Sequence, residues 1–226
     1  MTDALIVAHG APADPLTQEA ALHRLADAVA ALMPGWRVRG ATLAAPGALE
    51  AALAGLDRPV VFPFFMAEGW FTLRELPRRL AGAQVRQLRP FGTLPGLVAL
   101  CAAAARDGAA AAGIDPAGAA LLLAGHGSAV SRTSTVTTEA AAEALRLRGV
   151  FARVVTGYVE EVPYLAGAAR DLGPAVCLPF FALSAGHVTG DIPAALAAAG
   201  FAGPILPPIG AHPGAAGLIA AAIAAA

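Results

Sequence analysis

Two histidines and a glutamate in the second half of the chain are the residues best suited to chemistry. His126 follows a short apolar run, Glu160 follows the next predicted strand, and His187 comes a few residues after a third. Two imidazoles and one carboxylate suit a borderline divalent metal ion such as cobalt, iron, nickel or zinc. Glu160, or its neighbour Glu161, could instead accept a proton. The pattern predicts a metal site, an acid–base site, or both.

The elements that must position these residues alternate between strand and helix, which predicts parallel sheets with helices on both faces. Ligand sites in such sheets lie beyond the carboxyl ends of the strands. Strands are expected at residues 4–8, 36–43, 59–65, 85–88, 119–124, 151–158, 175–181 and 204–206. Helices are expected at residues 17–32, 48–56, 73–80, 95–112, 135–147, 164–172, 192–199 and 213–225.

The chain carries an internal repeat. The pair His9-Gly10 recurs as His126-Gly127 (126 − 9 = 117), and Pro63-Phe64-Phe65 recurs as Pro179-Phe180-Phe181 (179 − 63 = 116). A Pro-x-Gly-x-x-Pro-Gly motif begins at Pro90 and again at Pro208 (208 − 90 = 118). A period of this length predicts two compact lobes. We expect an α/β fold with lobes at residues 1–113 and 114–226, each a four-stranded parallel sheet flanked by helices.

The two copies differ at the candidate ligands. At these offsets Glu160 corresponds to Ala44 and His187 to Trp70, whereas His126 corresponds to His9. Neither an alanine nor an indole binds metal. The repeat therefore predicts one working site in the second lobe and a degenerate site in the first, with the role of His9 left open.

Each candidate residue also has a purely structural interpretation. A lone histidine after a strand is more often structural, and Glu160-Glu161 could be a solvated loop. We expect His23 on a helix surface and His212 in a helix-entry turn. A further group could be ordinary core or a flat apolar wall for an aromatic ligand: Trp70, Phe71 and Met66.

Composition excludes several classes of function. The net charge of −1 gives no electrostatic case for nucleic acid or an anionic membrane. Residues 192–226 carry no Asp, Glu, Lys or Arg, but prolines interrupt them, and a spanning helix needs about 20 apolar residues. The first residues lack the basic region of a signal peptide, which predicts a cytoplasmic protein. Cys101 and Cys177 are expected to be buried small hydrophobes.

Three segments together resemble a known family. They are His126-Gly127-Ser128, the run Tyr158-Val159-Glu160-Glu161-Val162-Pro163, and Pro179-Phe180-Phe181 continuing to Gly186-His187-Val188 and Asp191-Ile192-Pro193. These motifs are similar to those of the class II tetrapyrrole chelatases, and above all to the sirohydrochlorin chelatases of the CbiX and CbiK type. The resemblance is strong over residues 119–214 and weaker over residues 4–96.

The resemblance implies insertion of a divalent metal substrate, Co²⁺ or Fe²⁺, into sirohydrochlorin or a related tetrapyrrole, without a nucleotide, for cobalamin or siroheme biosynthesis. It gives His126, His187 and Glu160 the roles of metal ligands and proton acceptors. The macrocycle is expected in a cleft between the lobes. Its expected neighbours are Trp70, Met66, Phe71 and Leu183, with Arg132, Arg74 and Arg78 as candidates for its carboxylates.

Two other functions are alternatives to metal insertion. A non-catalytic tetrapyrrole or metal carrier would share the ligands without turnover. A histidine phosphatase would need an arginine before the His-Gly pair, where this chain has Ala8 and Gly125. Because the duplication already supplies two lobes, we expect a monomer, with a homodimer as the alternative.

Overall fold

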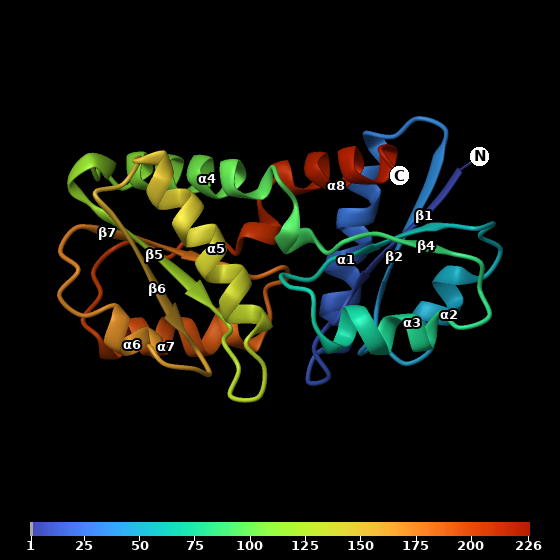
Figure 1. Cartoon of the computed structure of the whole chain (residues 1–226), viewed down its shortest axis with the longest axis horizontal. Helices are drawn as coiled ribbons and strands as arrows, with labels where there is room; N and C mark the ends of the chain where they lie inside the picture. Colours follow the sequence, from blue (N-terminus) through green and yellow to red (C-terminus); the bar gives the residue numbers. More distant parts are fainter. Residues whose placement is uncertain (1) are drawn as a thin grey trace. The chain divides into compact units, whose positions relative to one another are not determined.

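The computed structural model describes residues 2–226 and divides them into two compact units (Figure 1). Of the described residues, the first unit comprises 2–94 and 213–226, and the second comprises Pro95–His212. Within residues 2–226, no helix is both long and apolar enough to cross a membrane.

The first unit is built on a parallel sheet of order β2-β1-β3-β4. Its strands are β1 (Thr2–Ala8), β2 (Trp36–Thr42), β3 (Val60–Pro63) and β4 (Arg86–Gln87). Its helices are α1 (Pro15–Ala31), α2 (Ala48–Leu53), α3 (Leu76–Arg79) and α8 (Gly214–Ala224). Helices α1 and α8 pack together on the sheet, while α2 and α3 share an apolar cluster with residues of β1 and β3.

The second unit repeats this plan with a sheet of order β6-β5-β7. Its strands are β5 (Ala120–Gly125), β6 (Arg153–Tyr158) and β7 (Ala175–Pro179). Its helices are α4 (Leu97–Ala111), α5 (Thr133–Arg148), α6 (Leu165–Ala168) and α7 (Ile192–Ala198). Helices α4 and α5 pack together and contact the sheet, and α6 and α7 share an apolar cluster with β5 and β7.

The central strand of each sheet is the most deeply buried element. Every residue from Ala4 to Ala8 in β1 and from Ala120 to Gly125 in β5 is buried. A strand covered by helices on both faces needs such a continuous apolar run. In both sheets the next strand in the chain pairs with one side of the central strand, and the strand after it pairs with the other side. Ligand sites in such sheets lie beyond the carboxyl end of the strand where the order reverses.

The compact units divide the chain differently from the sequence repeat. The last helix of the first copy, α4, packs against β7 of the second unit, and the last helix of the second copy, α8, packs against α1 and β3 of the first. The predicted boundary after residue 113 therefore separates the two copies of the sequence repeat. Each folded unit instead contains the last helix of the other copy.

Both units contain one turn of π-helix just before a short α-helix, and this turn extends the helix toward the N-terminus beyond the expected start at residue 73 or 192. These turns are η1 (Phe71–Glu75), which runs into α3, and η4 (His187–Asp191), which runs into α7. Each is followed by a proline in the second helical position, Pro77 or Pro193. A proline ring inside a helix clashes with the carbonyl four residues earlier, so a widened turn accommodates it.

The predicted fold class is confirmed, with local differences. The fourth strand expected at residues 204–206 is reduced to a bridge between Ile205 and Cys177. Helix α1 begins two residues earlier than expected, because Asp14 caps it by accepting a hydrogen bond from the Thr17 amide. Both cysteines are buried and free, as predicted.

Candidate metal and proton-transfer site

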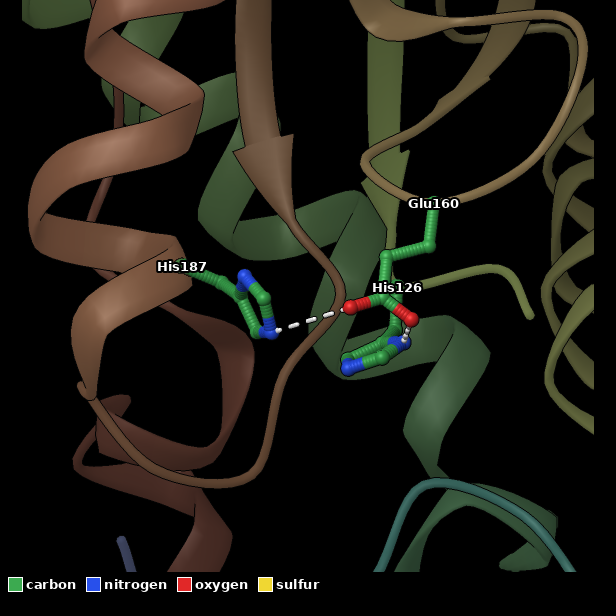
Figure 2. Close-up of side chains that lie close together, drawn as sticks. All are labelled: His126, Glu160 and His187. Carbon is green, nitrogen blue, oxygen red and sulfur yellow. Dashed lines mark ion pairs between the residues drawn. The ribbon is translucent and has the colours of Figure 1, made fainter. Parts of the chain in front are cut away.

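The second unit brings the three predicted ligands together. His126, Glu160 and His187 each offer a ligand atom, and these atoms all lie within 4.8 Å of one another. Figure 2 shows the Glu160 carboxylate between the two rings, with one oxygen 3.7 Å from His126 Nδ1 and the other 3.7 Å from His187 Nε2. The ring centroids of the two histidines are 4.6 Å apart.

The segments after β5 and β6 and the start of η4 hold these side chains. His126 directly follows β5, and its carbonyl accepts a hydrogen bond of 2.9 Å from the Glu160 amide beyond β6. His187 is the first residue of η4, in a segment between the expected third strand and the expected helix for which the sequence predicted no element. π-helical turns are frequent at functional sites.

Hydrogen bonds at Nδ1 determine which nitrogen each histidine offers. His126 Nδ1 lies 2.7 Å from the Gly127 carbonyl oxygen, which can only accept, so this nitrogen carries the proton. His187 Nδ1 lies 2.6 Å from Asp191 Oδ2, whose carboxylate is likewise an acceptor. In the neutral rings, Nε2 of both histidines is left with a lone pair for a cation.

Glu161 has a structural role distinct from that of Glu160. Its carboxylate accepts hydrogen bonds from the Thr135 hydroxyl and from the Ser128 amide, and these donors hold the pKa of Glu161 below its usual range. Gly127 lies between, with φ of +72°, and a Cβ there would come within 2.7 Å of Glu161 Cβ. Glu161 thus anchors the loop after β5, and Glu160 faces the histidines.

The site is accessible to solvent. The side chains of His126, Glu160 and His187 are 41%, 48% and 35% exposed. Ligand atoms bound to one metal at about 2.1 Å lie roughly 3.5 Å apart, so small side-chain movements would close this set on a cation. Two neutral imidazoles and a carboxylate suit borderline divalent ions, and the exposure suits exchange of the cation.

The corresponding place in the first unit holds aromatic rings instead. His9 Nδ1 lies 2.8 Å from the Gly10 carbonyl, as in the second unit, but its ring packs 4.2 Å from Phe71. The Ala44 amide donates to the His9 carbonyl, which confirms that Ala44 corresponds to Glu160.

The predicted match of His187 to Trp70 is wrong by one residue. Phe71 begins η1 as His187 begins η4, so Phe71 corresponds to His187 and Trp70 to Gly186. The neighbouring phenylalanines agree, since Phe71 stacks on Phe65 at 6.1 Å and His187 faces Phe181 at 6.5 Å. A one-residue shift along a helix turns a side chain by about 100°, so the correction changes which side chain faces His9.

Several repeated motifs are scaffold. Gly92 and Gly210, from the Pro-x-Gly motif, lie so close to the loop after β3 or β7 that a Cβ would overlap a backbone oxygen, at 1.7 Å from Met66 and 2.0 Å from Ala182. A glutamate in the helix that follows the central strand, α1 or α5, also accepts a side-chain hydrogen bond from the end of the next strand in each unit, Glu19 from Thr42 and Glu139 from Tyr158.

The residues predicted to contact a macrocycle are spread over both units. In the first, Trp70 is 62% exposed, while Phe71 and Met66 are partly buried. In the second, Leu183 is partly buried and Arg132 is exposed at the start of α5. Arg74 is exposed, whereas Arg78 is held by Glu75 at 2.6 Å.

The remaining histidines lie elsewhere. His23 is 57% exposed on α1, where it contacts Glu19, in agreement with the predicted surface position. His212 directly follows a 3₁₀ turn and precedes α8, as expected of a helix-entry turn.

Comparisons with known proteins show what the chain resembles in sequence and in fold. The family model CbiX matches residues 120–226. The structure of CbiX, described as the terminal enzyme for biosynthesis of siroheme in denitrifying bacteria, is 49% identical, with a TM-score of 0.91, and the match covers 100% of this chain and 99% of that one. A search of curated proteins finds no match.

Two further structures share the fold. A multi-domain protein from Deinococcus radiodurans, described as similar to chelatases with two additional novel domains, is 28% identical with a TM-score of 0.74, over 99% of this chain and 54% of that one. SirB from Bacillus subtilis, determined with Fe³⁺, is 16% identical with a TM-score of 0.74, over 99% and 95% of the two chains. The repeat, the fold and the near-complete match at 49% identity give one conclusion: the chain belongs to the CbiX family of sirohydrochlorin chelatases.

Proposed function

We propose that the chain inserts a divalent metal into sirohydrochlorin at the site formed by His126, Glu160 and His187. The observation that carries the proposal is the meeting of these three side chains in the second unit, where the first unit has His9 with Ala44 and Phe71. A scaffold role would predict similar polar groups in both units.

The reaction exchanges two pyrrole N–H protons for one divalent cation. The Nε2 atoms of His126 and His187 bind the incoming cation, and Glu160 completes the set. As the cation leaves for the macrocycle, the same three groups regain lone pairs and can accept the two released protons. Metal substrate and protons compete for these atoms, so metallation is expected to weaken in acid.

We infer that iron is the metal and siroheme the product, with cobalt and the cobalamin route as the alternative. The 49%-identical relative, which is named for siroheme biosynthesis, supports iron. The ligand set itself accepts either ion. Steady-state metallation with Fe²⁺ under anaerobic conditions, compared with Co²⁺ at equal free concentration, distinguishes the two by kcat/KM.

The macrocycle has an extended apolar face and several carboxylates. We propose Leu183 as an apolar contact and Arg132 as a carboxylate partner, both in the unit that holds the metal site. Arg132 supports this role through its charge and exposure, whereas Arg78 is already neutralised by Glu75. Replacement of Arg132 by Gln is expected to raise KM for sirohydrochlorin and leave KM for the metal unchanged.

An absorbance assay separates an enzyme from a carrier. The protein is mixed with an excess of sirohydrochlorin and metal, and the spectral change of the macrocycle is followed. Product beyond one equivalent of protein, over the rate without protein, supports catalysis. A plateau at one equivalent would instead support a tetrapyrrole or metal carrier.

A further inference from the structure

The two histidines of the site differ in what holds them. His126 donates its Nδ1 proton to a neutral backbone carbonyl, whereas His187 donates to the carboxylate of Asp191. A carboxylate behind an imidazole fixes the ring orientation and the tautomer, and it makes the opposite nitrogen a stronger donor to a metal.

His187 and Asp191 meet across one helical turn. His187 and Asp191 are the first and last residues of η4, four positions apart, and the His187 carbonyl accepts from the Ile192 amide five residues on. Residues four apart lie on one side of a helix. The turn therefore directs the Asp191 carboxylate to Nδ1 at 2.6 Å and leaves Nε2 directed to Glu160 at 3.7 Å.

The first unit lacks this arrangement although its backbone is the same. Phe71 corresponds to His187, and Glu75, which corresponds to Asp191, pairs with Arg78 at 2.6 Å. The acidic residue at the end of the turn thus serves a local ion pair in one unit and a histidine in the other. The partner of this acidic residue therefore depends on whether a histidine or a phenylalanine begins the turn.

We propose that Asp191 is a positioning residue that holds His187 with Nε2 toward the incoming metal and strengthens that nitrogen as a ligand. The inference rests on the proposed function for the identity of the metal site. Asp191 acts through His187, so its removal weakens capture of the metal and leaves binding of the tetrapyrrole intact.

The test measures Co²⁺ binding to the full chain by calorimetry and by the visible absorption of the bound ion. Asp191→Ala is expected to weaken binding about 10–100-fold. Asp191→Asn is expected to fall between Ala and wild type, because the amide oxygen still accepts from Nδ1 but carries no charge. Glu75→Gln is the matched control in the first unit and should bind Co²⁺ as wild type does.

A double variant shows whether Asp191 acts through His187. If it does, His187→Ala/Asp191→Ala binds Co²⁺ no more weakly than His187→Ala alone, because Asp191 contributes to metal binding only when His187 is present. In turnover, Asp191→Ala should raise KM for the metal and leave KM for sirohydrochlorin unchanged. The Asp191 side chain is 58% exposed, so thermal unfolding of the variants should match wild type.

Two results would overturn the inference: Co²⁺ affinity of Asp191→Ala within about twofold of wild type, against the expected loss, or additive losses in the double variant. Failure of the proposed function gives a different pattern, in which wild type binds Co²⁺ but forms no product beyond one equivalent. Because the binding assay needs no turnover, the role of Asp191 is tested in either case.

Discussion

The two units share a backbone and differ in their chemistry. Both place a histidine after the central strand, bond its Nδ1 to the next carbonyl, and follow the third strand with a π-helical turn. In the second unit this frame carries Glu160 and His187, and in the first it carries Ala44 and Phe71. The residues that differ, Glu160 and His187, therefore mark the site, which also uses His126, whose counterpart His9 the first unit keeps.

The largest expected effect comes from removing a ligand that only the second unit has. His187→Ala should reduce metallation by on the order of 100-fold or more, because it removes both a metal ligand and a proton acceptor. His9→Ala removes a ring contact with Phe71 and a hydrogen bond to the Gly10 carbonyl, and it should retain most activity. The steady-state rate of metallation measures both variants, and loss of activity in His9→Ala alone would reverse the assignment of the working site.

The comparison can also be tested by building a site. The double variant Ala44→Glu/Phe71→His gives the first unit the residues of the second, and it should bind a second equivalent of Co²⁺ in calorimetry. The control Ala44→Glu/Trp70→His places the imidazole one residue earlier and should not, since Trp70 corresponds to Gly186. If the control bound a second equivalent of Co²⁺ and the test variant did not, His187 would correspond to Trp70, as the sequence repeat predicted.

A smaller effect is expected at the glycine after each histidine. Gly127→Ala and Gly10→Ala place a side chain at φ of +72° and +77° against close neighbours, and each should lower stability by up to about 3 kcal/mol. Only Gly127→Ala should also weaken Co²⁺ binding. Gly118→Ala, with open space around its Cβ, is the control. Urea unfolding and calorimetry measure the two effects, and weaker Co²⁺ binding in Gly10→Ala would contradict the division.

The smallest effect concerns acid stability, which should differ between the units. Arg37 donates to Asp3 at 2.7 Å and 2.9 Å, and these bonds, with one from the Asp57 amide, hold the pKa of Asp3 below its usual range. In the second unit the residue paired in register with Arg153 is Ala120.

Because the pKa of Asp3 is lowered by folding, its contribution is complete above the unfolded value of about 3.9 and is lost as the pH falls through the folded value. Asp3→Asn should therefore lower stability by about 1.5 kcal/mol at neutral pH, with the difference shrinking in acid. Thermal unfolding across pH measures it, with Asp57→Asn, whose carboxylate is 84% exposed, as the control. A difference that stays constant into acid would contradict this account.

Sequence alone predicted much of the fold. The continuous apolar runs of β1 and β5 identify strands covered on both faces, and the alternation with helices identifies parallel sheets. The exchange of α4 and α8 was not predicted, because periodicity reports that a helix has an apolar face and not which sheet that face covers.

At the site, too, part of the arrangement was predictable from the sequence and part was not. The sequence determined the identities of His126, Glu160 and His187 and their places after parallel strands, because residue type and strand order suffice for that. Only the tertiary structure decided that Glu160 and not Glu161 faces the histidines, and that Asp191 holds His187. The spacing of four residues from His187 to Asp191 was the available signal. Such orientations depend on a single residue of helical register, which hydrophobic patterns do not resolve.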